Sequence, residues 1–457
     1  MFLRHSTTRL ARRLAHHHHR RQTYTTTTAT TTTGAPQRLT GFHHISSLRR
    51  ATFLRHNFQL SKTKSFSSPL TTSTVHAIPP TATAASHAVT IPYKSLASWL
   101  FGCAGMVFGM VVVGGSTRLT RSGLSMTDWK VTGRLPPMNE EDWAIEFAKY
   151  RNFPEYKRLN MSMTQEEFKS IYWWEWGHRM WGRAIGVVFV APLVYFAARR
   201  QIPTHQYGRL ALLMGMGGGQ GLIGWWMVQS GLDHTHVFGI ERSEHDTPRV
   251  SPYRLTTHLS MAFATYGLLS WTAMDLWRLG SGSSGANGSL SRAVQPMAKA
   301  VQRLRTVSAI VTAVLGVTVL SGGFVAGNDA GRAYNDWPLM AGKFIPEEIW
   351  NSDLGVRNFF ENTATVQFDH RMLATATVSS VAAILLMARQ PGVWSTLPLE
   401  ARTAIMTMAG VTCGQYALGV TALMNYVPVE LGVAHQAGAL TTWTAAIVLM
   451  NVLKHVK

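Results

Sequence analysis

The sequence predicts an all-α integral membrane protein with eight transmembrane helices, arranged as two pseudo-symmetric four-helix bundles. Three observations predict this fold. Only 14% of the 457 residues are charged, against about 25% in typical soluble domains. From residue 96 onward, apolar runs recur that are each long enough for a helix to cross a bilayer. The later runs repeat motifs of the earlier ones in the same order.

The first 94 residues differ in composition from the rest of the chain. They contain 13 Lys or Arg and no acid, and the first acidic residue of the chain is Asp128. A basic, Ser/Thr-rich segment without acids is typical of a mitochondrial transit peptide, and it is too polar to bury a core. We therefore expect residues 1–94 to be a transit peptide and disordered leader. Because this leader carries 13 of the net charge of +20, the basic balance does not indicate nucleic-acid binding.

The chain has only two cysteines, Cys103 and Cys413, and each lies inside an apolar run. This number excludes a disulfide-rich scaffold and a cysteine-based zinc site. We expect both thiols to be buried as small apolar side chains.

Eight apolar runs are the predicted membrane helices. They cover residues 96–115, 176–197, 207–229, 255–275, 305–327, 364–388, 403–424 and 432–453. The connections after the even-numbered runs are rich in Lys and Arg, whereas residues 327–363, after an odd-numbered run, hold six acids against three bases. By the positive-inside rule, both termini face the matrix.

The second half of the body repeats the first. The motifs that recur are Gly114-Gly115 as Gly322-Gly323, Asp128-Trp129 as Asp336-Trp337, His178-Arg179 as His370-Arg371, Gly219-Gln220 as Gly414-Gln415, and His258 as His435. Each repeat has four helices, an even number, so both enter the membrane in the same direction and are related by an axis along the membrane normal. We expect an N-terminal bundle at 95–277, a flexible matrix linker at 278–303 and a C-terminal bundle at 304–457.

Four histidines lie in the predicted membrane helices: His178, His258, His370 and His435. In each half they belong to the second and fourth helices, near the end that faces the intermembrane space. Ionisable groups in membrane helices are rare and usually functional. One such histidine alone would indicate a hydrogen bond between helices, but two pairs in register favour ligands. Two facing imidazoles suit haem iron better than zinc, which needs further protein ligands.

The residues beside these histidines suggest further roles. Arg179 and Arg371 lie near the membrane surface, where they would pair with haem propionates or extend to the interface. Glu175 lies one helical turn before His178, on the same face, and the aligned residue is Gln367. Glu175 is therefore a candidate for chemistry in one half only, or an acid that complements a helix N-terminus. Asp369 is a candidate partner of His370.

At this point the chain resembles a known family, haem A synthase of the mitochondrial type. The most specific segments are residues 114–125 (GGSTRLTRSGLS) and 328–338 (NDAGRAYNDWP), and the resemblance covers residues 95–455. It implies an enzyme that oxidises one ring methyl of haem O to a formyl by successive hydroxylations, giving haem A for cytochrome c oxidase.

The resemblance also implies roles for the site residues. His370 and His435 would be the axial ligands of a resident haem b, with Arg371 beside it. His178 and His258 would flank the substrate haem O, with Arg179, and Glu175 would be the catalytic group.

The resemblance further implies a place and partners for the protein. The place is the mitochondrial inner membrane, and electrons would come from a ferredoxin-type donor in the matrix. Haem O synthase and assembly factors of cytochrome c oxidase are candidate partners. A second copy of this chain, in a homo-oligomer, is a further candidate. The residues alone leave two alternatives. One is a di-haem b electron-transfer cytochrome linked to quinone, without methyl chemistry, and the other is a transporter built from parallel repeats.

Overall fold

The computed structural model describes residues 90–126, 128–232, 236–237, 240–241, 248–282 and 295–456. Residues 1–89, which hold nearly all of the expected transit peptide, lie outside the described residues. The helical body belongs to one compact unit that spans Ala84–Lys457.

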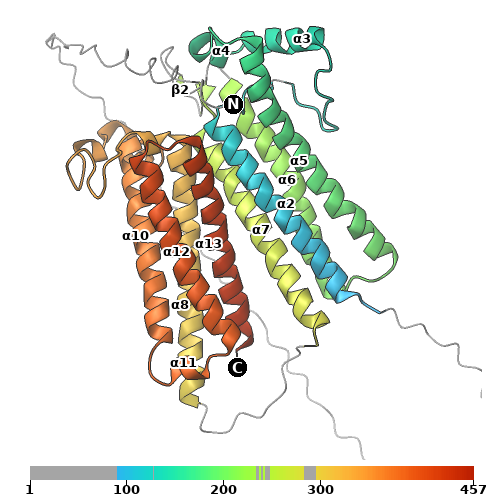
Figure 1. Ribbon diagram of the computed structural model, residues 1–457, viewed down its shortest axis with the longest axis vertical. Coiled ribbons are helices and arrows are strands. Elements are labelled where there is room, and N and C mark those ends of the chain that lie inside the picture. The colour runs from blue at the N-terminus through green and yellow to red at the C-terminus, as the bar shows by residue number, and fades with distance from the viewer. Residues whose placement is uncertain are drawn as a thin grey trace, which may run out of the picture. The chain divides into compact units, whose positions relative to one another are not determined.

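Eight long helices make up this body (Figure 1), and each of the eight predicted runs lies within one of them. They are α2 (Tyr93–Leu119), α5 (Gln165–Ala198), α6 (Tyr207–Leu232), α7 (Pro252–Gly280), α8 (Gln295–Gly327), α10 (Thr363–Ala388), α12 (Leu399–Met424) and α13 (Val429–His455). Among the described residues, five of them, α2, α5, α8, α10 and α13, are long and apolar enough to cross a membrane. The protein is therefore a helical protein with the composition of an integral membrane protein.

Shorter elements connect the long helices. They are the helices α3 (Glu140–Arg151), α4 (Pro154–Leu159), α9 (Asn358–Glu361) and α11 (Val393–Thr396), the 3-10 helices η1 (Thr204–Gln206), η3 (Ala330–Arg332), η4 (Glu347–Ile349) and η5 (Ser352–Arg357), and the strands β1 (His236–Val237) and β2 (Ile240–Glu241). The two strands pair antiparallel. The range expected as a linker, 278–303, is helical up to Gly280 and again from Gln295, and residues 283–294 lie outside the described residues.

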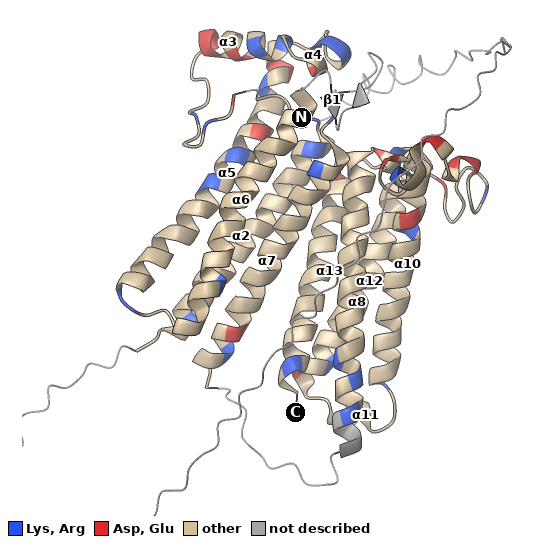
Figure 2. Ribbon diagram, turned by 180° about the vertical axis from the view of Figure 1, so that it is seen from behind, with Lys and Arg blue, Asp and Glu red and all other residues tan. Residues whose placement is uncertain are grey.

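A small apolar cluster packs α3 against the N-terminal part of α5, and two larger clusters pack the long helices. One packs α2, α5, α6 and α7 together, and the other packs α8, α10, α12 and α13. Both views of the fold show the same two groups of helices (Figures 1 and 2). Val319 and Trp443 contact both clusters, so the groups share one interface. Cys103 is buried as expected, but Cys413 is exposed on α12, because the face of α12 that carries it does not pack into the core.

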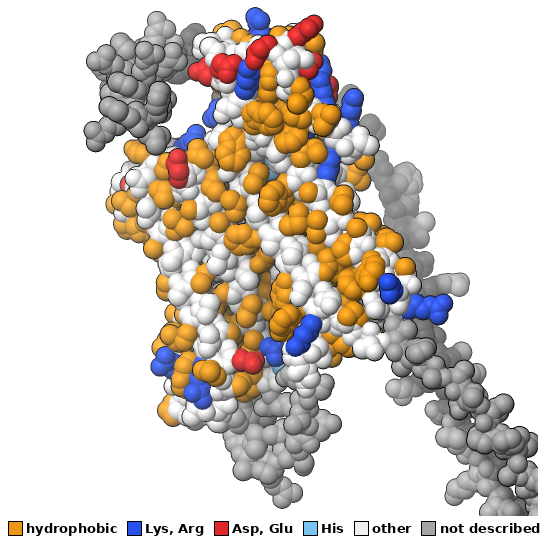
Figure 3. Space-filling view, turned by 45° about the vertical axis from the view of Figure 1, so that its right-hand side comes forward, with side chains coloured by type: hydrophobic (Ala, Val, Ile, Leu, Met, Phe, Trp, Pro, Cys, Tyr) orange, Lys and Arg blue, Asp and Glu red, His pale blue; other side chains and the backbone are white. Residues whose placement is uncertain are grey.

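Charged side chains gather toward the two ends of the long helices, and the stretches between them carry few (Figure 2). The space-filling view shows the same separation on one face, where hydrophobic side chains cover much of the surface between the charged ends (Figure 3). An apolar band between two charged ends is the surface that a bilayer requires.

The helix α5 begins earlier than the apolar pattern predicts. Thr164 and Glu167 form a reciprocal capping box at its N-terminus, which satisfies two free backbone N–H groups. Glu175 therefore lies ten residues inside the helix. The interpretation of Glu175 as an acid at a helix N-terminus is wrong, because the helix dipole acts within the first turn.

The α3–α4 segment contains a buried carboxyl group. Glu155 is 3% exposed and accepts a hydrogen bond from Tyr150 Oη at 3.2 Å. Burial raises the pKa of Glu155 from 4.5 to about 7. A pKa raised by folding contributes stability that is complete below the ordinary value and is lost as the pH rises through the folded value.

We predict that residues 140–160 open more readily at pH 8 than at pH 5, by on the order of 2 kcal/mol, since one pKa unit corresponds to about 1.4 kcal/mol. Hydrogen exchange of this segment, corrected for intrinsic rates, measures the difference. Glu155→Gln should remove most of it, whereas Glu141→Gln, at an exposed acid of α3, should keep it. Equal protection of the wild type at both pH values would contradict the prediction.

Candidate functional site

The first histidine pair lies on α5 and α7, and each imidazole packs on a glycine of a neighbouring helix. A Cβ atom added to Gly114 on α2 would lie 3.0 Å from Cε1 of His178. A Cβ added to Gly224 on α6 would lie 3.1 Å from Cε1 of His258. Each ring therefore fills the space that the Cβ atom of any residue other than glycine would occupy.

The second pair repeats this arrangement on α10 and α13. The added Cβ would lie 3.2 Å from His370 at Gly322, on α8, and 2.8 Å from His435 at Gly419, on α12. The centres of the two rings lie 6.5 Å apart, and their planes are nearly perpendicular, at 87°. The structure thus brings His370 together with His435 in a paired arrangement like the one expected from the repeat.

The second glycine of each Gly-Gly motif has a different role that the sequence did not indicate. A Cβ at Gly115 would lie 2.7 Å from Gln436 Oε1 on α13, and one at Gly323 would lie 2.9 Å from Thr256 Oγ1 on α7. Each motif therefore places one glycine against a histidine of its own half and the next against the other half. Gln436 also donates a hydrogen bond to the Val111 carbonyl at 2.8 Å, which holds the halves together.

The two pairs differ at Nδ1. Ser321 Oγ lies 2.8 Å from Nδ1 of His370, and Gln415 Nε2 lies 3.1 Å from Nδ1 of His435. Nδ1 of His178 and of His258 are buried and have no hydrogen-bond partner in the part of the chain that the structure describes. Ser321 donates its own hydroxyl to the Thr318 carbonyl, so it can accept from Nδ1–H of His370, which leaves Nε2 of that ring free as a ligand. The amide nitrogen of Gln415 is a donor, so this contact only orients the His435 ring.

Sequence differences account for this contrast. Val113 stands at the position that aligns with Ser321, so the first half has no hydroxyl there. The aligned Gln220 donates only to the backbone carbonyl of His258, at 3.2 Å. The partner of His370 is therefore Ser321, from another helix, and not the adjacent Asp369 that the sequence suggested.

Glu175 and Gln367 occupy equivalent positions. Glu175 is 4% exposed, and its Oε1 accepts a hydrogen bond from Nε of Arg179 at 2.6 Å. Gln367 is 2% exposed and accepts a hydrogen bond from Nη2 of Arg371 at 2.9 Å. One half thus holds a buried carboxyl group where the other holds an amide of nearly the same shape.

The two arginines also fix the loops that cover the helix ends. Arg179 donates to the carbonyls of Met126 and Asp128 at 2.8 and 2.9 Å, on the loop after α2. Arg371 donates to the carbonyls of Tyr334 and Leu339, both at 2.9 Å, on the loop after α8. These contacts are equivalent in the two halves. The pairing of the arginines with propionates stays a prediction.

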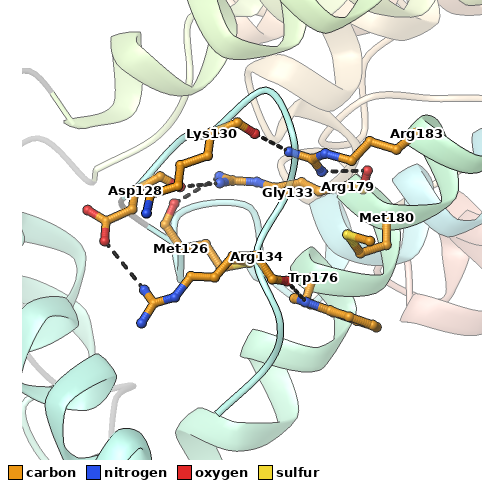
Figure 4. A pocket seen from close by; sticks show the side chains of 9 residues that line it. All are labelled: Met126, Asp128, Lys130, Gly133, Arg134, Trp176, Arg179, Met180 and Arg183. Carbon is orange, nitrogen blue, oxygen red and sulfur yellow. Dashed lines mark hydrogen bonds and ion pairs between the residues drawn. The ribbon is translucent and has the colours of Figure 1, made fainter. Parts of the chain in front are cut away.

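A small pocket lies where the first of these loops meets α5 (Figure 4). Its lining consists of Met126, Asp128, Lys130, Gly133, Arg134, Trp176, Arg179, Met180 and Arg183. Lys149 donates a hydrogen bond to Asp128 at 2.9 Å, which holds the pKa of that carboxyl below its usual range. None of the four histidines lines this pocket, so it is separate from the histidine pairs.

The third helices of the two halves also differ. Tyr416 on α12 hydrogen bonds to Thr375 on α10, with 3.0 Å between the hydroxyl oxygens, and its ring contacts Trp337. The aligned residue on α6 is Gly221, and no other atom lies within 4 Å of a Cβ added there. The C-terminal half is closed at this position, and the N-terminal half is open.

The spacing of His370 and His435 fits haem iron. Two imidazoles that bind one metal ion through nitrogens roughly 2 Å away have ring centres roughly 6 Å apart, close to the 6.5 Å between His370 and His435. In the described ranges, no group of three or more His, Cys, Asp or Glu could hold a metal ion. A porphyrin supplies the other four ligands of its iron, so two histidines are enough, and the glycines let a ring approach the backbone closely.

The fold and the site define a helical membrane protein with two pairs of half-buried histidines at equivalent positions. The sequence model of the COX15-CtaA family, described as cytochrome oxidase assembly protein, matches residues 97–447. The chain belongs to this family.

Curated relatives agree with the family. The chain is 46% identical over 371 residues to heme A synthase COX15 of Arabidopsis thaliana, covering 79% of this chain and 75% of the relative. It is 42% identical over 373 residues to heme A synthase COX15 of Saccharomyces cerevisiae, covering 79% and 76%, and 39% identical over 374 residues to that of Homo sapiens, covering 80% and 86%. The resemblance predicted from the sequence is confirmed.

We predict that Gly419→Ala lowers the haem content of the purified protein about tenfold. The new Cβ would lie 2.8 Å from the His435 ring, and overpacking of this kind costs about 1–3 kcal/mol. Gly414→Ala on the same helix is the control, because a Cβ there meets no atom within 4 Å. Absorbance per chain measures the content, and equal losses in both variants would contradict the prediction.

Proposed function

We propose that the protein is a haem A synthase, which oxidises a ring methyl of haem O to a formyl and so supplies haem A for cytochrome c oxidase. The relatives at 39–46% identity carry this name over most of the chain. One observation supports this function most strongly. Glu175 is a buried carboxyl group, and the equivalent position in the second half holds the amide Gln367. A pure electron carrier with two haems would not need this difference.

The membrane arrangement is part of the proposal. We infer that all eight long helices cross the inner mitochondrial membrane and form two four-helix bundles related by duplication, with both termini in the matrix. The equivalent contacts of Gly114 with His178 and of Gly322 with His370 support the duplication. Three of these helices, α6, α7 and α12, are less apolar than the other five. In α6 the reason is its many glycines, which add little apolar surface.

The C-terminal bundle, residues 304–457, would hold the resident haem b between His370 and His435. Both imidazoles are restrained by a partner at Nδ1. Ser321 can accept from Nδ1–H of His370, which leaves Nε2 of that ring free as a ligand. Tyr416 closes this bundle between α10 and α12. Haem b supplies one-electron redox chemistry, which no side chain of this chain provides.

The N-terminal bundle, residues 95–277, would bind the substrate haem O between His178 and His258. Neither ring is fixed by a partner at Nδ1, and α6 is open at Gly221. These features suit a molecule that must enter and leave. Arg179 and Arg371 would lie at the edge of each haem, where the loops that they hold cover the site.

Glu175 would be the catalytic residue of the N-terminal bundle. Its carboxyl group is buried one helical turn from His178 and is oriented by Arg179 at 2.6 Å. A carboxylate in this place supplies negative charge next to the substrate, either to accept a proton or to stabilise positive charge that develops at the methyl group. The neutral amide of Gln367 can neither accept a proton nor supply negative charge. We therefore propose that the oxidation takes place in the first half.

We also propose the location and partners. The acid-free leader 1–94 supports import into mitochondria, and the eukaryotic relatives share the name COX15. Electrons would come from a ferredoxin-type donor at the matrix face. The substrate would come from haem O synthase, and the product would pass to assembly factors of cytochrome c oxidase.

We predict that Glu175→Gln keeps the haem content but lowers haem A formation by at least about 100-fold, a loss typical of a group that acts in proton transfer. The amide can keep the hydrogen bond to Arg179, as Gln367 does with Arg371. Glu166→Gln, at an exposed acid of the same helix, is the control. Haem A is measured by mass after extraction, and normal product from Glu175→Gln would disprove the assignment.

We predict that Gly221→Tyr reduces haem A formation at least about tenfold while the resident haem stays bound. The tyrosine would close α6 as Tyr416 closes α12, and no atom of the protein obstructs a Cβ at this position. Turnover and the absorbance of haem b are compared with those of Gly215→Tyr, at another open glycine of α6. Full activity of Gly221→Tyr would show that the opening is not used.

A further inference from the structure

A second hollow lies between the two halves and extends toward the ends of the helices opposite the histidines. It has a volume of about 840 Å³ and is lined by α2, α7, α12 and α13. This volume is within the range of small-molecule sites in proteins. We refer to it as the interhelical groove. Its lining includes Phe101, Tyr266, Thr407, Val448, Arg278 and Glu400.

The interhelical groove lies toward the opposite ends of the helices from the histidine pairs. On α2, Phe101 lines the groove and Gly114 contacts His178. These residues are 13 positions apart, roughly 20 Å along a helix. On α7, His258 is near the first residue of the helix, whereas Arg278 is near the last. None of the four histidines lines the groove, and its inner end at Thr441 on α13 lies six positions, roughly 9 Å, from His435.

The lining is amphipathic along the helices. Its inner part is apolar and aromatic, with Phe108 on α2 and Val411 on α12 among its residues, and its end carries Arg278, Ser281 and Glu400. The chemistry of this lining suits a ligand with a long apolar part and a polar head at the end of the helices.

The charges at that end favour an anionic head. Arg278 contacts Glu400 only at 3.7 Å, and the Glu400 side chain is 72% exposed, so this pair is weak. Lys94 lies 6.0 Å from the ring of Trp277, which lines the groove. Arg278 is the cation of the described lining, and Lys94 lies close to it beside Trp277, so two cations stand near the exposed Glu400 at this end.

We propose that the interhelical groove binds an anionic phospholipid from the leaflet at this end, with its phosphate at Arg278 and an acyl chain between the two halves. Basic pockets between membrane helices on the matrix side bind anionic lipid head groups in other proteins. The inference rests on the proposed membrane arrangement and not on the haem chemistry. The lipid would join α2 and α7 of one half to α12 and α13 of the other.

The test uses the full chain purified in mild detergent and incubated with equal amounts of cardiolipin and phosphatidylcholine. Native mass spectrometry then counts each lipid per chain. The wild type should retain the anionic lipid at least fivefold over the neutral one. Arg278→Gln should abolish this preference, and Arg199→Gln, at an exposed cation at the C-terminal end of α5, should keep it.

A second variant tests the apolar part of the site. Thr407→Trp should fill the groove from an exposed position and remove the bound lipid. Haem content is recorded for every variant, so a protein that fails to fold is recognised separately from one that loses lipid. Equal retention of both lipids by the wild type, unchanged preference in Arg278→Gln, or recovery of a quinone in place of phospholipid would overturn the proposal.

Discussion

The contact between an imidazole and a bare glycine backbone is the constraint on which the site depends. It occurs four times, and in each case the ring lies where a Cβ atom would otherwise stand. The glycine and the histidine lie on neighbouring helices, so the contact sets the distance between those helices. Two such contacts in each half hold a pair of imidazoles across the interior. For His370 and His435, the resulting separation of 6.5 Å is the one that a single iron requires.

The two halves share a set of equivalent contacts, which we call the frame, and they differ from each other at single residues. The frame itself is retained in the glycines, the histidines and the arginines that hold the loops. The differences are small: a hydroxyl at Ser321 against an apolar Val113, a ring at Tyr416 against Gly221, and an amide at Gln367 against the carboxyl of Glu175. Each change makes the second half more fixed or less reactive. In the proposed function, they would separate a permanent haem from one that is processed.

Much of this could be predicted from the sequence, because its strongest signals are local. The eight apolar runs predicted the long helices, and the repeated motifs predicted the histidine pairs. Features that depend on contacts between distant segments could not be predicted. Ser321 lies 49 residues from the histidine that it contacts, and Gly115 meets a side chain of the last helix. The capping box of α5 was also missed, since the predicted apolar run begins at residue 176, eleven residues after the first residue of the helix. The groove between the halves has no local signal at all.

The haem content of the purified protein tests the central claim most directly. The protein is expressed in cells that make haem O, its pigment is extracted, and each haem is identified by mass and counted per chain. The account predicts one haem b per chain together with haem O, haem A or an oxidised form between them. Two haem b per chain, with neither haem O nor haem A, would contradict it and would indicate an electron-transfer cytochrome instead.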